Sequence, residues 1–156
     1  MGRKGYILVF FLLLLVLFSS FQPREVTPYN QYYRWYTEEF AIPIDQALKD
    51  SNDTSTIKQY RQTRKAFFQA YEIAIDYPLP DKNLDKTHQH LLSYLEWRIK
   101  YVEGFIYYLQ TKSRDTKALV NNYNDEGNIH YSLFISGFDE YAKDQGQNFI
   151  TPRLLY

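Results

Sequence analysis

The chain has 156 residues, among them 16 Tyr, 11 Phe and no Cys, and its 18 basic residues balance 18 acidic ones. This length is enough for one domain and too short for two. The balanced charge argues against a nucleic-acid-binding protein, which normally carries a basic excess. The absence of Cys excludes disulfides, thiolate metal sites and cysteine nucleophiles.

The N-terminal segment is the strongest signal in the sequence. Arg3 and Lys4 precede an unbroken apolar run over residues 7–18, and no charge occurs between Lys4 and Arg24. A helix without a polar face does not lie on the surface of a soluble domain, and the uncharged stretch is just long enough to cross a bilayer. We therefore expect residues 1–21 to be an uncleaved signal anchor that contacts the lipid bilayer through residues 7–18.

A cleaved secretory signal peptide is the alternative interpretation of this segment. Cleavage requires small residues at the last and third-last positions before the cut, whereas cutting after Ser19 or Ser20 places Leu17 or Phe18 at the third-last position. This favours the anchor. By the positive-inside rule the two basic residues stay in the cytoplasm. The rest of the chain is then expected outside the cytoplasm, on the cell membrane, or secreted if the segment is cleaved.

The remaining sequence predicts an all-α fold, because apolar residues recur at helical spacing and no hairpin dipeptide separates them. After a tether over residues 22–27, four helices are expected. Their ranges are about 28–49, 54–76, 84–112 and 116–143. Short connections between long helices favour an antiparallel up-and-down four-helix bundle over residues 28–146, with a C-terminal tail over 147–156. The third helix carries two adjacent apolar stripes and should contact two neighbours.

Several residues predict local features of these helices. Thr27 is a candidate N-cap of the first helix, Asp115 a candidate N-cap of the fourth, and Gly146 a stop signal. Pro43 should kink or split the first helix, because it has no N–H to donate. Gly127 lies among four Asn residues, so a bend or local opening is expected in the fourth helix.

Arg64 is a charged residue within an apolar stripe of the second helix. If the first two helices pair about a turn near residues 50–52, Glu39 lies opposite Arg64. An unpaired buried charge is very unfavourable. We therefore expect a half-buried ion pair between Glu39 and Arg64, with a structural role.

Tyrosine dominates the aromatic residues, with 15 Tyr against 7 Phe after Phe21. The first helix is aromatic on all sides of its first two turns, so some rings are expected at the surface. Exposed amphipathic rings suit the membrane–water interface, or the centre of a contact with a protein or a small ligand. An aromatic core with hydroxyls at its rim is the competing interpretation. The candidate partner-binding residues are Tyr29, Tyr32, Tyr33, Trp35 and Tyr36.

Patterns typical of enzymes and metal sites are missing from the sequence. It contains no nucleophile elbow, no phosphate loop and no paired Glu-x-x-His of a di-iron bundle, so no catalytic residue, cofactor or metal is assigned. His88 and His130 are interpreted as partly buried, hydrogen-bonded histidines, about ten residues apart along the bundle. The expected register places His130 level with Trp97. Glu126 and His130, four residues apart on one helix face, are the only conceivable site for an enzyme.

These observations favour a membrane-anchored, extracytoplasmic helical bundle that is not an enzyme. It would bind a protein partner or a ligand at the cell envelope, in an accessory, immunity or exclusion, or sensory role. Two alternatives stay open. One is a secreted soluble bundle, and the other is an enzyme with a site near His130 and Glu126.

Overall fold

The computed structural model describes residues 26–51 and 57–148, so the predicted anchor over residues 1–21 lies outside the described residues, as does most of the predicted tail. The described chain is all-helical, as predicted. Its elements are α2 (Pro28–Trp35), the π-helix η1 (Tyr36–Ala41), α3 (Ile42–Ser51), α4 (Ile57–Ile75), the 3-10 turn η2 (Lys82–Leu84), α5 (Asp85–Thr111) and α6 (Arg114–Asp144).

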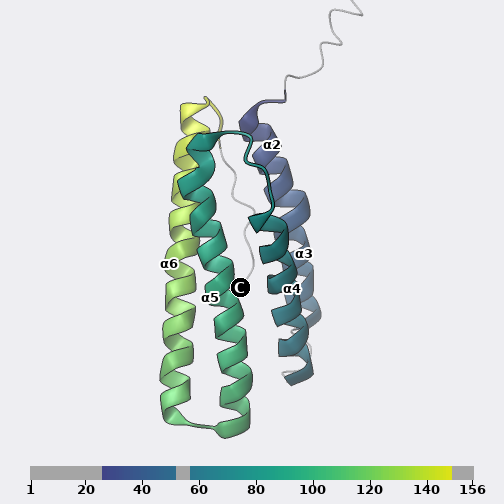
Figure 1. The fold of residues 1–156 in the computed structure, drawn as a ribbon, viewed down its shortest axis with the longest axis vertical. Coiled ribbons are helices and arrows are strands. Elements are labelled where there is room, and N and C mark those ends of the chain that lie inside the picture. The colour runs from purple at the N-terminus through teal and green to yellow at the C-terminus, as the bar shows by residue number, and fades with distance from the viewer. Residues whose placement is uncertain (1–25, 52–56, 149–156) are drawn as a thin grey trace, which may run out of the picture.

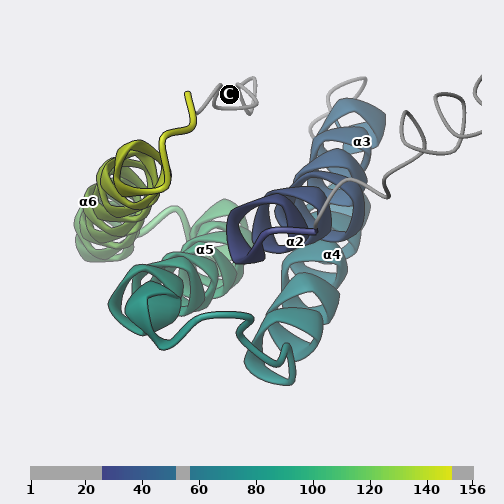
Figure 2. The same ribbon diagram turned by 90° about the horizontal axis from the view of Figure 1, so that it is seen from above.

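The elements form four long rods, of which the first consists of α2, η1 and α3 in succession. Figure 1 shows that each rod runs in the opposite direction to the one before it, which is an up-and-down arrangement. Figure 2, seen from above, places α5 beside both α4 and α6, and these are the two neighbours predicted for the third helix. Among the described residues, no helix has the length and apolar character needed to cross a membrane.

Most of the predicted helix ends are confirmed. The Thr27 hydroxyl accepts a backbone N–H from the first turn of α2, and Gly146 follows α6 with a φ of 67°. The N-cap of α6 is Ser113 rather than Asp115, because the Ser113 hydroxyl accepts an N–H from the first turn. Asp115 lies within that turn, where its negative charge is favourable near the positive end of the helix dipole.

The first rod is interrupted at the predicted place, just before Pro43. The N–H of Ile42 bonds to the carbonyl of Thr37, five residues earlier, so the α-helix gives way to a π-helix. A π-turn holds one residue more than an α-turn, which keeps the apolar residues on both sides of the interruption in the core. The buried residues of this stretch are Tyr36, Phe40, Ala41 and Ile44.

The predicted local opening at Gly127 is absent, since α6 is a continuous α-helix over its whole length. Gly127 is buried against Trp97 and Arg98 of α5. On either side of it, the side-chain oxygens of Asn124 and Asn128 accept hydrogen bonds from the guanidinium of Arg98, each over 2.6 Å. Arg98 is only 6% exposed. The poor helix-formers in this stretch therefore bind a buried cation rather than open the helix.

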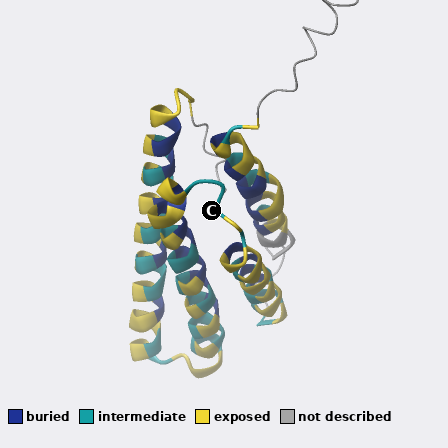
Figure 3. Ribbon diagram, turned by 45° about the horizontal axis from the view of Figure 1, so that its top comes forward, coloured by how far each residue is buried: buried dark blue, intermediate teal, exposed yellow. Residues whose placement is uncertain are grey.

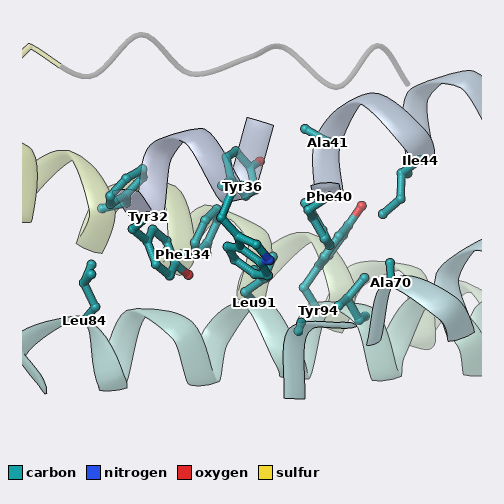
Figure 4. Close-up of a cluster of buried hydrophobic side chains, with 14 of the residues drawn as sticks. Tyr32, Tyr36, Phe40, Ala41, Ile44, Ala70, Leu84, Leu91, Tyr94 and Phe134 are labelled. Carbon is teal, nitrogen blue, oxygen red and sulfur yellow. The ribbon is translucent and has the colours of Figure 1, made fainter. Parts of the chain in front are cut away.

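The core is mainly aromatic and follows the inward-facing sides of the rods (Figure 3). Its largest fully buried side chains are Tyr32, Tyr36, Tyr94, Phe40, Phe134 and Phe138. Rings join α2 and η1 to α6, since Tyr29 of α2 stacks on Phe138 with centroids 5.5 Å apart and Tyr36 of η1 meets Phe134 at 5.0 Å. Figure 4 shows Phe40 and Ile44 of the first rod pointing toward the helices that carry Ala70 and Tyr94.

Candidate functional site

A buried hydrogen-bond relay joins α2, α4 and α5 near the end of the bundle where α2 begins. The Tyr32 hydroxyl lies 2.9 Å from Nδ1 of His88, whose Nε2 lies 2.8 Å from the carbonyl oxygen of Ala74. Because a carbonyl oxygen only accepts, Nε2 carries a proton, and in neutral His88 the remaining Nδ1 accepts from the Tyr32 hydroxyl. Both ring nitrogens are thus bonded, which confirms the interpretation of His88 as a buried, hydrogen-bonded histidine.

Burial keeps both side chains of the relay uncharged. Desolvation lowers the pKa of His88, against smaller opposing effects from its hydrogen bond to Ala74 and from the carboxylate of Asp85. Desolvation also raises the pKa of Tyr32 well above its ordinary value, and the nearby Tyr77 adds to this rise. At neutral pH the relay is a fixed, uncharged link between three helices.

Trp35 and Tyr77 form a stacked pair beside the relay. Their ring centroids are 4.1 Å apart and their planes are inclined by 17°. The Trp35 ring also lies 5.6 Å from the ring of His88 and 5.3 Å from that of Tyr32. Tyr77 follows α4 and begins a Tyr-Pro-Leu-Pro connection, in which the two prolines restrict the backbone. Each ring of the stack therefore comes from an ordered backbone segment: Trp35 from α2, and Tyr77 from the proline-restricted connection.

Two buried polar atoms of this stack have no hydrogen-bond partner among the described residues. They are the indole Nε1 of Trp35 and the hydroxyl oxygen of Tyr77. Leaving a buried donor or acceptor unsatisfied costs about 1–3 kcal/mol, and native proteins contain few such groups. Both atoms are inaccessible to solvent, so a group bound nearby reaches them only if the stacked rings move.

A surface hollow of about 670 Å³ is lined by Trp35 and Tyr77. Its other lining residues belong to α2, to η1 and to the chain just before them: Val26, Asn30, Gln31, Arg34, Glu38 and Glu39. Arg34 and Glu38 form an exposed ion pair over 3.0 Å. Burial raises the pKa of Tyr77, and the charge of Glu39 raises it further. The hollow therefore combines aromatic rings, two amide side chains and a formal charge of −1 from one Arg and two Glu.

The structure places most of the predicted partner-binding residues in the core rather than on the surface. Tyr29, Tyr32, Trp35 and Tyr36 are each at most 5% exposed, and Tyr33 is half-buried. Their rings pack against rings of α5, α6 and the connection after α4, which agrees with the competing interpretation of an aromatic core. Trp35 is the one of these residues that lines the hollow. Partner binding by the group as a whole stays a prediction.

The predicted ion pair between Glu39 and Arg64 is wrong. Arg64 of α4 pairs instead with Glu103 of α5, and both side chains are more than 40% exposed. Glu39 lines a hollow between the first rod and α4, and the residues of α4 at this hollow all follow Arg64 in the chain, from Ala66 to Ile73. The connection between the two helices comes later in the chain than the assumed turn, and this shifts their register.

Two histidines meet across α5 and α6, a pair that the register expected from the sequence does not bring together. Nδ1 of His90 lies 3.3 Å from Nδ1 of His130, with ring centroids 5.5 Å apart. The expected register placed His130 level with Trp97, and only His88 was considered as its possible neighbour. In the structure Trp97 lies against Tyr123, 5.7 Å between centroids. The observed pairing of α5 with α6 differs from the expected one by about two helical turns, and this shift brings His130 to His90.

The predicted enzyme site near Glu126 and His130 stays untested. The hydrogen-bond partner that the structure gives for His130 is His90, across the helix pair. Within residues 26–51 and 57–148, no group of three or more His, Asp or Glu side chains is arranged to hold a metal ion.

Comparison with known proteins gives no relative. No family model, no curated protein and no solved structure matches this chain. The class that the fold defines is an all-helical bundle protein.

Proposed function

We propose that this chain is a non-catalytic binding module, anchored by its N-terminal segment on the outer face of the cell membrane. The observation that carries the proposal is the hollow lined by Trp35 and Tyr77, where two buried polar atoms have no partner among the described residues. A small movement of the stacked rings would bring these atoms to the hollow, and a ligand's hydrogen bond to them would remove an existing cost instead of displacing a formed hydrogen bond.

The rigid surroundings of the hollow support a binding role. The relay from Tyr32 through His88 to Ala74 fixes three helices beneath the stack. A site that is ordered before binding loses little conformational entropy when the partner arrives. The partner's contact energy therefore appears largely as affinity.

The chemistry of the hollow fits a peptide segment with a basic side chain. The Trp35 indole N–H donates to a carbonyl oxygen, and the Tyr77 hydroxyl either donates or accepts. Glu39 supplies a carboxylate beside Tyr77, as its effect on the pKa of Tyr77 shows. A backbone carbonyl over the stack and an Arg or Lys near Glu39 would satisfy all three groups.

The position of the hollow favours a partner at the membrane surface. Val26 lines the hollow and lies within the predicted tether, residues 22–27. Six extended residues span at most about 20 Å. If residues 1–21 are anchored, the hollow lies close to the headgroups, within reach of another membrane protein's extracytoplasmic segment.

Photo-crosslinking in intact cells of the source organism tests the binding role. A photoreactive residue in place of Asn30 or Gln31, two exposed positions beside the hollow, should give one discrete adduct from both positions. The same residue in place of Lys117, exposed at the start of α6, is the control and should not give this adduct. The same adduct from all three positions, or none from the two positions beside the hollow, would contradict the proposal.

Membrane fractionation with intact-mass measurement tests the anchor separately. The proposal expects the full-length mass in the membrane fraction. A soluble product that lacks about 20 N-terminal residues would show that the bundle is secreted and not anchored. The crosslinking result would then test the binding role independently of the anchor.

A further inference from the structure

His90 and His130 approach each other with the spacing that a metal ion requires of two ligands. Their Nδ1 atoms are 3.3 Å apart, and their planes are inclined by 40°. An ion bound to each nitrogen at about 2.0–2.1 Å in tetrahedral geometry separates the nitrogens by about 3.3–3.4 Å. We propose that His90 of α5 and His130 of α6 together bind a divalent transition-metal ion, with water completing its coordination.

The hydrogen bond between the two rings suits this role. Without a metal, an Nδ1–H of one ring donates to Nδ1 of the other, so one ring already presents its lone pair toward its neighbour. Metal binding requires only that the Nδ1 proton of one ring moves through solvent to Nε2 of that ring.

The pair is accessible from solvent. Both side chains are only half-buried, and His90 lines a hollow of about 440 Å³ between α5 and α6, with Thr87, Leu133 and Gly137 among its other lining residues. No third His, Asp or Glu in the described chain completes a protein-only cluster. The site is therefore bidentate and open to exchange with water.

The ligand set indicates which ions bind. Two imidazole nitrogens favour borderline ions, and affinity at a given site rises through Ni²⁺ to Cu²⁺ and then falls at Zn²⁺. Mg²⁺ and Ca²⁺ prefer oxygen ligands and should not bind. The site does not include Trp35 or Tyr77, so this inference does not depend on the proposed function.

Metal titration of the full chain in detergent, purified without a polyhistidine tag, tests the site. Calorimetry should show one Cu²⁺ per chain, weaker binding of Ni²⁺ and Zn²⁺, and none of Mg²⁺. His90→Gln and His130→Gln should each weaken Cu²⁺ binding at least about tenfold. Asp125→Asn, which removes an exposed carboxylate of the same helix five residues from His130, is the matched control and should leave the affinity unchanged.

Pulsed electron paramagnetic resonance of the Cu²⁺-loaded protein gives a second readout that needs no variant. The proposal expects modulation from two imidazole nitrogens in the unaltered chain, and from one in either Gln variant. One imidazole in the unaltered chain, or Cu²⁺ affinity that is unchanged in both Gln variants, would overturn the site. Circular dichroism of the metal-free variants verifies that they remain folded.

Discussion

The hydroxyl of Tyr32 donates a hydrogen bond to Nδ1 of His88 over 2.9 Å, and this contact fixes the end of the bundle on which the candidate binding hollow lies. His88 in turn donates from Nε2 to the last turn of α4, at Ala74. The Trp35–Tyr77 stack lies against these rings. The site thus depends on a link between helices that are distant in the sequence.

Tyr32→Phe should destabilise the protein by about 1–3 kcal/mol, because Nδ1 of His88 would lose its donor inside the core. Urea unfolding followed by circular dichroism measures the change. Tyr107→Phe is the matched control, since Tyr107 is 57% exposed and should change stability by less than about 0.5 kcal/mol. Equal stability of the two variants would show that the relay contributes nothing.

The stability of the protein should fall as the pH drops below about 6.5, the ordinary pKa of His. Because burial lowers the pKa of folded His88, the unfolded chain binds its proton first, and stability is lost until the folded pKa is reached. The lowered pKa of His90 acts in the same direction. Unfolding free energies between pH 5 and pH 8, a range set by histidine titration, measure this slope.

Two variants separate the contributions to that slope. His88→Gln should flatten the pH dependence even though it destabilises the fold at every pH, and His90→Gln should remove only a part of it. A slope that is the same in both variants and in the unaltered chain would mean that these histidines do not control acid stability.

The Asn residues of α6 should respond to the same substitution in opposite directions. Asn124→Ala removes an acceptor of the buried Arg98 guanidinium, which is worth about 1.5–3 kcal/mol and outweighs the better helix propensity of Ala. Asn121→Ala, at an exposed position one turn earlier, should stabilise by a few tenths of a kcal/mol. Chemical denaturation of both variants tests the sign, and stabilisation in both would contradict the role of Asn124.

The glycines of the α5–α6 interface give a similar paired prediction. A Cβ at Gly137 would lie 2.6 Å from Oγ1 of Thr87, so Gly137→Ala should destabilise by about 1–3 kcal/mol. A Cβ at Gly127 would meet its nearest atoms at 3.6 Å, which is ordinary contact, so Gly127→Ala should gain helix propensity and stabilise by up to about 1 kcal/mol. Thermal unfolding of the two variants distinguishes them, and destabilisation by Gly127→Ala would contradict the packing described.

The sequence predicted the helices well because their signals are local. Thr27, Pro43 and Gly146 act on the backbone within one turn, so cap, interruption and stop were found at the expected residues. The local opening expected at Gly127 was wrong, because helix propensity was the only signal considered there. The contact between Asn124 and Arg98 joins two helices, and a single-helix pattern does not contain it.

The candidate site could not be predicted to the same extent, because it depends on register between helices. A later connection after α3 separated Glu39 from Arg64, and a shift in the pairing of α5 with α6 brought His130 to His90. The aromatic first helix was recognised as unusual, yet only packing decides that Trp35 lines a hollow while its neighbours fill the core.

Tyr77→Phe tests the central claim most directly, because it removes a buried hydroxyl that has no partner among the described residues and leaves the ring stack in place. Two quantities are measured on this variant: the unfolding free energy, and the yield of the crosslinked adduct from Gln31. A binding hollow predicts unchanged or higher stability together with an adduct yield lower by about tenfold, the equivalent of one lost hydrogen bond. An unchanged yield at unchanged stability would contradict a role for the hollow in binding.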